Sequence, residues 1–311
     1  MQTPIYIVGA GAIGMTLAVL LRQAGKNVVL LRSRPTSQAE ADVLITVEFN
    51  DGTSQTARLP IGTLDDIDRL HGLVLLTNKS FGNAELARRL RGKTGDSPLI
   101  LLQNGLAIEQ PYLEAGFPQV YRCVLLATSQ VRTPYMVSYK PVAASPVGVI
   151  RGDASGLAAL VEQITTTDFP FRAEKNIQVA IWEKVVTNCV FNAICPLLGV
   201  DNGIFHRNAS VLALAREVIS ECVVVAGEAG ITLDSQAVEQ RLLQISQRSD
   251  GQLISTLVDI NQGRETEIGT LNLEVARLAH RLGKPELAIR TQLLGELTRL
   301  KAEASRSTTG G

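Results

Sequence analysis

The sequence lacks most of the features that mark metalloproteins, nucleic-acid-binding proteins and membrane proteins. Its 30 basic residues are balanced by 30 acidic ones, so no excess of positive charge favours nucleic acid or an anionic membrane surface. Its three histidines stand far apart and show no metal-ligand spacing. No apolar run approaches the roughly 18 residues that a transmembrane helix needs, and the first residues show no signal-peptide pattern. We therefore expect a cytoplasmic protein that uses no metal and binds neither nucleic acid nor membrane.

Cysteine is also scarce, and the four cysteines form no C-x-x-C pair: Cys123, Cys189, Cys195 and Cys222. Their neighbours in sequence are apolar, which predicts buried free thiols in a reducing compartment.

A glycine-rich motif stands out in what remains. An apolar run at residues 5–8 precedes it, and a helical pattern of leucines follows it. G-x-G-x-x-G between a strand and a helix is typical of dinucleotide binding: the first glycine allows the tight turn, the second lets backbone approach a pyrophosphate, and the third lets helix and strand pack closely. The residues predicted to hold the cofactor here are Gly9, Ala10, Gly11, Ala12, Ile13 and Gly14.

The end of the second predicted strand indicates which dinucleotide is used. Residues 28–31 are apolar and lead into Arg32-Ser33-Arg34, with no carboxylate before Glu40. NAD-binding proteins place an acidic residue at this position for the ribose 2′-hydroxyl, whereas an arginine accommodates a 2′-phosphate. We therefore predict NADPH/NADP as the cofactor, held through Arg32.

Strand and helix patterns alternate through the first half of the chain, and the second half is helical almost throughout. This predicts an α/β fold, with an N-terminal Rossmann-like doubly wound domain followed by an all-α C-terminal domain. We expect the domains at residues 1–174 and 175–303 and a disordered tail at 304–311. Strands are predicted at 5–8, 28–31, 44–49, 55–59, 73–77, 99–102, 121–127, 136–139 and 147–150, near 171, with a hairpin at Asn50-Asp51-Gly52.

Ligands of such sheets bind outside the carboxyl ends of the strands. Lys79 follows the predicted strand 73–77, and Asn104 follows the strand 99–102. Together with Arg32 they are expected at the edge that carries the glycine loop, which favours a site for both cofactor and substrate.

Three polar residues interrupt an otherwise apolar, helical run between Ile177 and Gly203. Lys184, Asn188 and Asn192 are spaced four apart, so they form one stripe on a helix whose other residues are suited to burial. Buried polar groups are costly unless something polar meets them. They either hydrogen-bond other side chains where two domains meet or line a polar cavity that holds a ligand.

A later segment, residues 255–268, adds hydroxyl and acidic groups. Ser255 opens it, and Glu267 begins an apolar helical pattern. Glu267 is equally suited to be a helix N-terminal carboxylate favoured by the dipole and to be a site residue.

The order and spacing of these stretches resemble the ketopantoate reductase (2-dehydropantoate 2-reductase) family over nearly the whole chain. The segments that carry the resemblance are GAGAIG, LLRSR, the lysine of TNKS, LLQNG, WEKVVTNCVFN with a later DNG, and SxLxDI…GRETEI. The resemblance implies an NADPH-dependent oxidoreductase that converts ketopantoate to pantoate in pantothenate and coenzyme A biosynthesis.

The resemblance also implies roles for single residues. Lys184 corresponds to the general acid of the family, and Glu267 to a residue that holds the lysine or the substrate in place. The positions implied for substrate are Asn104, Asn188, Asn192, Asn202 and Ser255, and those for the cofactor beyond the glycine loop are Arg32, Lys79 and Asn104. A small 2-oxo acid is the expected partner, and the sequence is compatible with a homodimer.

This chain departs from the family pattern at Gln252, at Gly82 and in the segment before Val147. Gln252 is one methylene longer than the asparagine that is common there, and a change of that size is enough to shift the preference among 2-oxo acids. The alternatives are therefore a reductase of a different small 2-oxo acid, a 3-hydroxyacid dehydrogenase, and an NADPH-binding sensor without turnover.

Overall fold

The computed structural model describes residues 3–33 and 39–309, and the chain divides into two compact units. The first contains residues up to 103 together with 108–177, and the second contains 104–107 together with the residues from 178 onward. The short segment 104–107 thus belongs to the helical unit although it lies within the α/β part of the sequence.

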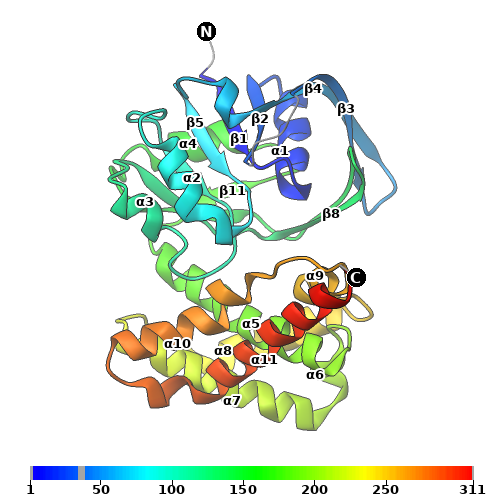
Figure 1. Ribbon diagram of the computed structural model, residues 1–311, viewed down its shortest axis with the longest axis vertical. Helices are drawn as coiled ribbons and strands as arrows, with labels where there is room; N and C mark the ends of the chain where they lie inside the picture. The colour runs from blue at the N-terminus through cyan, green and yellow to red at the C-terminus, as the bar shows by residue number, and fades with distance from the viewer. Residues whose placement is uncertain (1–2, 34–38, 310–311) are drawn as a thin grey trace. The chain divides into compact units, whose positions relative to one another are not determined.

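The first unit is an α/β structure built on one mixed sheet of eleven strands (Figure 1). Its order is β11-β10-β7-β6-β5-β1-β2-β4-β3-β9-β8. The strands are β1 (Ile5–Val8), β2 (Val28–Arg32), β3 (Glu40–Phe49), β4 (Ser54–Thr63), β5 (Leu73–Leu76), β6 (Leu99–Leu101), β7 (Val120–Cys123), β8 (Ala127–Thr133), β9 (Met136–Pro141), β10 (Ser145–Arg151) and β11 (Phe171–Ala173). The helices are α1 (Ala12–Gln23), α2 (Asn83–Leu90), α3 (Gln110–Glu114) and α4 (Leu157–Ile164), with short 3-10 turns η1 (Leu64–Asp66) and η2 (Ser80–Gly82).

The central strands from β7 to β4 run parallel, and their residues alternate between two apolar cores. Leu30 and Leu75 point into the core that holds α1 and α4, whereas Leu31 and Leu76 point into the core that holds α2 and α3. Helices therefore cover both faces, as a doubly wound sheet requires, and this part of the fold prediction is confirmed.

Antiparallel strands extend the sheet at both sides. The hairpin of β3 and β4 turns at Gly52, whose φ of 86° suits glycine. Beyond it, β9 and β8 continue the sheet so that it curves around α1, as Figure 1 shows. The Thr16 hydroxyl of α1 lies 3.0 Å from the Ser129 hydroxyl of β8. The single strand predicted at 121–127 is wrong: β7 ends at Cys123 and β8 is a separate strand, whose mostly exposed residues carry little apolar signal.

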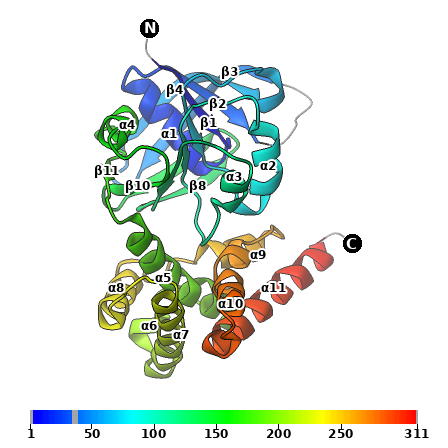
Figure 2. The same ribbon diagram turned by 90° about the vertical axis from the view of Figure 1, so that its left-hand side faces the viewer.

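The second unit is helical (Figure 2). Its elements are α5 (Ile177–Leu198), α6 (Ile204–Arg207), α7 (Ala209–Glu228), α8 (Ser235–Arg248), α9 (Ser255–Asn261), η3 (Glu267–Thr270), α10 (Asn272–Arg281), η4 (Pro285–Ala288) and α11 (Ile289–Thr309). The apolar residues of α5 are buried, among them Trp182 and Ile194.

The tail predicted from residue 304 is wrong as far as Thr309, because α11 continues to that residue. The Ser305 hydroxyl donates to the Ile260 carbonyl at 2.8 Å, and Arg299 pairs with Glu303 one helical turn later. The first contact joins this end of α11 to α9 and the second lies within α11, and the serine- and threonine-rich composition indicated neither. The predicted burial of all four free cysteines is confirmed.

Candidate active site

The glycine loop combines tight packing with one open position. A Cβ on Gly9, whose φ is 126°, would lie 2.6 Å from the Asn78 amide nitrogen, and a Cβ on Gly14 would lie 1.8 Å from the Gly9 carbonyl oxygen. A Cβ on Gly11 would meet nothing within 4 Å. Gly9 and Gly14 therefore allow the close packing of the turn, and Gly11 leaves room for a ligand.

Helix α1 begins at this open position. Gly11 is its N-cap, and no side chain caps the first turn. The first N–H groups of a helix have no partner within it, and they favour an anion. The loop therefore has both the room and the N–H donors that an anionic group would need.

Arg32, the last residue of β2, forms an ion pair with Glu40 at the start of β3. The other carboxylate oxygen of Glu40 accepts a hydrogen bond from the Tyr135 hydroxyl. The Tyr135 hydrogen bond and the Arg32 guanidinium lower the pKa of Glu40 below its ordinary value. Glu40, eight residues after Arg32 in the sequence, therefore lies directly beside it in the structure. Arg34, the second arginine of this segment, lies outside the described residues.

Lys79 is exposed and precedes η2, three residues after β5. Since β5, β1 and β2 are parallel neighbours, Lys79, Gly9 and Arg32 lie at or just after strand ends at one edge of the sheet. This edge is the usual ligand side of a doubly wound sheet.

A buried pair of amides supports the loops at this edge. Asn83 Nδ2 donates to Gln103 Oε1 at 3.0 Å, and Gln103 Nε2 donates to Asn83 Oδ1 at 2.6 Å. Asn78 also donates to Asn83, at 3.2 Å. None of these three residues was predicted from the sequence: Asn78 and Gln103 directly precede the predicted residues Lys79 and Asn104, and Asn83 stands four residues after Lys79.

The second unit brings together residues that are far apart in the chain. Asn104 Nδ2 lies 3.4 Å from Glu267 Oε2, and the Leu106 amide donates to the Thr270 carbonyl at 2.7 Å. Residues 104–107 therefore lie against η3, and Ala107 adopts a positive φ of 54° there. Such backbone is uncommon for alanine and persists where surrounding contacts enforce it.

A second cluster joins α5 to α9. Asn192 is buried, and its Oδ1 accepts hydrogen bonds from Thr256 Oγ1 at 2.7 Å and from Ser255 Oγ at 3.4 Å. Lys184 and Asn188 are half-buried on the same helix. Thr256 was not predicted, although it directly follows a predicted residue.

Asn202 lies outside both groups of contacts. Its backbone amide donates to the Gln252 carbonyl at 2.9 Å, and its own carbonyl accepts from Ser246 Oγ at 2.7 Å. Its side-chain oxygen is buried without a hydrogen-bond partner among the described residues. Gln252 itself is exposed, whereas Asn202 is buried. The hydrogen bond between the two residues uses the backbone of Gln252 and does not involve its side chain.

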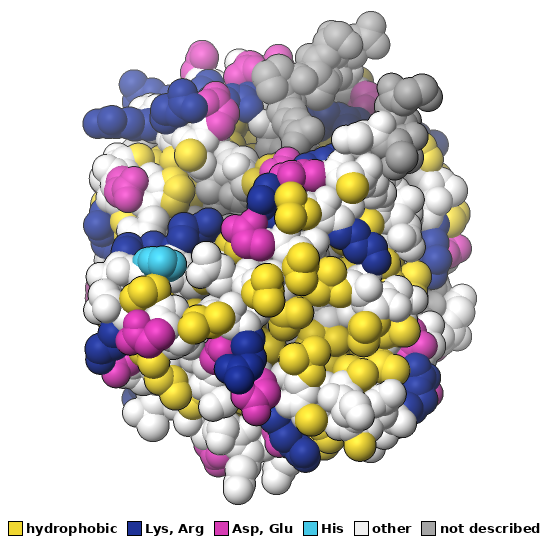
Figure 3. Space-filling view, turned by 60° about the horizontal axis from the view of Figure 1, so that its bottom comes forward, with side chains coloured by type: hydrophobic (Ala, Val, Ile, Leu, Met, Phe, Trp, Pro, Cys, Tyr) yellow, Lys and Arg dark blue, Asp and Glu magenta, His cyan; other side chains and the backbone are white. Residues whose placement is uncertain are grey.

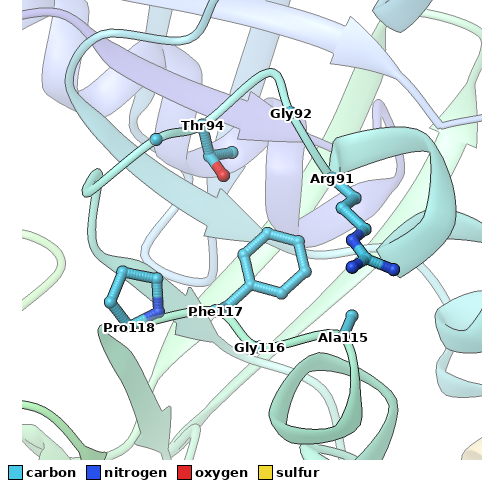
Figure 4. A pocket seen from close by; sticks show the side chains of 8 residues that line it. Arg91, Gly92, Thr94, Ala115, Gly116, Phe117 and Pro118 are labelled. Carbon is cyan, nitrogen blue, oxygen red and sulfur yellow. The ribbon is translucent and has the colours of Figure 1, made fainter.

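A pocket of about 120 Å³ lies away from the ligand edge (Figure 4). The segments around Arg91 and Gly116 that line it precede β6 and β7, so they lie at the amino ends of these parallel strands. Its polar side chains are those of Arg91 and Thr94, which do not make up a catalytic set.

Other kinds of site are not found in the part of the chain that the structure describes. Within residues 3–33 and 39–309, no group of three or more histidine, cysteine and acidic residues is arranged to hold a metal ion. None of the described helices combines the length and apolar character needed to cross a bilayer.

Solved structures of other proteins share the fold of this chain. D-mandelate dehydrogenase, solved with NADH and anilino(oxo)acetate, is 21% identical with a TM-score of 0.82, over 97% of this chain and 99% of that one. A dimeric ketopantoate reductase from Staphylococcus aureus is 19% identical with a TM-score of 0.81, over the same shares of the two chains.

Sequence comparison adds the family. The 2-dehydropantoate 2-reductase of Pyrococcus abyssi is 26% identical over 280 residues, which are 88% of this chain and 90% of that one. Residues 5–142 match the family profile of ketopantoate reductase PanE/ApbA, and residues 176–301 match the profile of its C-terminal part. The chain therefore belongs to the ketopantoate reductase PanE/ApbA family.

Proposed function

We propose that this protein reduces 2-dehydropantoate to pantoate with NADPH, as a cytoplasmic step of pantothenate and coenzyme A biosynthesis. The observation that carries the proposal is the meeting of Asn104 and Glu267 at 3.4 Å across 163 positions of the sequence. Such a contact assembles an amide and a carboxylate from separate segments in one place, within a chain whose family reduces this substrate. The buried free thiols fit a reducing compartment.

The proposed mechanism assigns proton transfer and orientation to the helical unit. The bound nicotinamide would supply the hydride, so negative charge would develop on the carbonyl oxygen of the substrate. The Lys184 ammonium would stabilise this oxygen and protonate it, and Glu267 and Asn104 would orient the reacting groups. The hydroxyl of Ser255 would meet the substrate carboxylate beside Asn192, while Asn188 and Asn202 would bind the substrate's other polar groups.

An assay of NADPH oxidation tests the proposal. Ketopantoate should be turned over, and a panel of other 2-oxo acids, including aromatic ones, should rank the substrates. The panel matters because Gln252 departs from the family pattern and because D-mandelate dehydrogenase has the same fold. Turnover of another acid alone would favour a reductase of different specificity, and no turnover of any acid would favour the sensor.

Replacing Arg32 by alanine should remove the preference for NADPH. We expect the wild type to bind NADPH at least about tenfold more tightly than NADH, because a guanidinium pairs strongly with a phosphate. Fluorescence titration of both dinucleotides measures this. Equal affinities in the wild type, or an unchanged preference in Arg32→Ala, would contradict the assignment of Arg32.

We also propose that the protein is a homodimer that associates through α11. The support is an inverted pattern on this helix: Thr291, Thr298 and Ala302 are buried, whereas leucines face solvent. The exposed residues are Ile289, Leu293, Leu297 and Leu300, which are 43–60% exposed. Figure 3, in which the bottom of the Figure 1 view comes forward, shows hydrophobic side chains gathered on this face. A dimeric relative has the same fold.

The spacing of these leucines suits a second copy of the same helix. Leu293, Leu297 and Leu300 are four and three residues apart, which is the spacing of helices that pair along an apolar seam. A two-fold interface uses one surface twice, so a single apolar stripe is sufficient.

Leu297→Glu should convert the dimer to a monomer in sedimentation velocity. A charge without a partner at an apolar interface is costly, so we expect the dissociation constant to rise at least about tenfold. Val142→Glu, at an exposed apolar residue of the first unit, is the matched control and should leave the dimer intact. A wild type that is monomeric at high concentration would contradict the dimer, and a dimeric Leu297→Glu would contradict this face.

A further inference from the structure

Arg32, at the end of β2, already has a carboxylate partner. Its guanidinium is paired with the Glu40 carboxylate, and the two side chains are 33% and 31% exposed. A ligand can therefore reach the pair, and a group that binds Arg32 must do so beside a negative charge.

Tyr135 fixes this carboxylate in place. Its hydroxyl donates to the oxygen of Glu40 that Arg32 does not use. The tyrosine lies in the turn between β8 and β9, and its carbonyl accepts from the Thr46 amide at 2.9 Å. Since both oxygens are held, the carboxylate is a fixed part of the strand end, with its charged form favoured by both partners.

The two dinucleotides meet this arrangement differently. The 2′-phosphate of NADPH is a dianion that gains from Arg32 but is repelled by a carboxylate beside it. The 2′-hydroxyl of NADH is a hydrogen-bond donor, and a carboxylate at the end of the second strand is the group that accepts it in NAD-binding proteins. Arg32 and Glu40 thus favour opposite cofactors at the same place.

We propose that Glu40, positioned by Tyr135, is the residue that limits the preference for NADPH over NADH. The inference rests on the proposed function, because it assumes that a nicotinamide dinucleotide binds at this strand end. Glu40 forms an ion pair with the Arg32 guanidinium and so competes with the 2′-phosphate for it. The same carboxylate can accept a hydrogen bond from the 2′-hydroxyl of NADH.

The test measures dissociation constants of NADPH and NADH without substrate, in the wild type and in Glu40→Gln. Glutamine keeps the shape: its Oε1 can accept from Arg32 and its amide nitrogen can donate to the Tyr135 hydroxyl oxygen, but the charge is removed. We expect the affinity ratio of NADPH to NADH to rise by roughly tenfold, because the repulsion removed acts between partly exposed charges and is weakened by water. Adenosine 2′,5′-bisphosphate should show the same gain over adenosine 5′-monophosphate, which confines the effect to the 2′-phosphate.

Two further variants separate this role from a general charge or stability effect. Asp42→Asn removes the neighbouring carboxylate on β3, which pairs with Arg58 instead, and should leave the ratio unchanged. Tyr135→Phe should raise the ratio less than Glu40→Gln does and should add nothing in the Glu40→Gln background. A purely structural role of Tyr135 would weaken both dinucleotides equally.

The outcomes separate the inference from the function on which it rests. An unchanged ratio in Glu40→Gln, or an equal rise in Asp42→Asn, overturns the inference. Binding of both dinucleotides with the expected ratios, but no turnover of any 2-oxo acid, overturns the proposed reductase and leaves the role of Glu40 standing. Failure of the wild type to bind either dinucleotide overturns both.

Discussion

Lys184→Ala should lower turnover of the preferred 2-oxo acid by roughly 10²-fold to 10⁴-fold, the usual contribution of general acid catalysis. The lysine is half-buried on α5, one turn before Asn188 and two before Asn192. It is the cation that the proposed mechanism places at the carbonyl oxygen. Because Lys184 belongs to the helical unit, NADPH binding through the glycine loop should survive the change.

The control variants for this prediction separate charge from proton transfer. Lys184→Arg keeps a positive charge but hardly donates a proton at neutral pH, so it should recover only part of the loss and should alter the pH profile. Lys175→Ala removes an exposed lysine just before the same helix and should leave turnover unchanged. Near-normal turnover in Lys184→Ala would mean that this lysine only satisfies hydrogen bonds in the structure.

Glu109→Ala should destabilise the first unit by about 3–5 kcal/mol. Glu109 precedes α3 and forms an ion pair with Arg122 of β7, whose side chain is only 2% exposed. Removing the Glu109 carboxylate takes away the negative charge that pairs with the buried Arg122 guanidinium. The guanidinium cannot become neutral by losing a proton, so its positive charge stays buried.

Hydrogen exchange of β6 and β7 measures this loss better than tryptophan fluorescence does. The single tryptophan, Trp182, belongs to the helical unit and does not report on the first one. Glu85→Ala breaks the exposed pair with Arg88 and should have a far smaller effect. Combining Glu109→Leu with Arg122→Met should restore much of the stability, since no unpaired charge remains. Equal protection in Glu109→Ala and the wild type would contradict the prediction.

The sequence predicted those parts of the structure that depend on local pattern. The glycine loop, the alternation of strands and helices and the apolar face of α5 each follow from residues close together in the chain. The antiparallel strand β8 was missed because its exposed residues, such as Gln130 and Arg132, show no apolar alternation. The end of α11 was missed because a contact with Ile260, far away in sequence, holds it.

The site shows the same division. Residue types and spacing predicted which polar residues stand at strand ends and along α5. They did not show that Glu40 forms an ion pair with Arg32. That pair depends on where β3 begins and on Tyr135, which lies in a turn about a hundred residues later in the chain. Nor did they show the amide pair of Asn83 and Gln103, which forms only when β5 and β6 lie side by side.

The curved sheet around α1 has a consequence for how the first unit folds. Helix α1 contacts β8 and β9, and β9 pairs with β3, whose residues stand about ninety positions earlier. At the other side, β11 (Phe171–Ala173) completes the sheet. Contacts over such separations must overcome the entropy of closing long loops, which slows folding. During synthesis, α1 can therefore pack first only on β1 to β4, and the side of the helix that meets β8 and β9 stays uncovered until residues beyond 140 have been made.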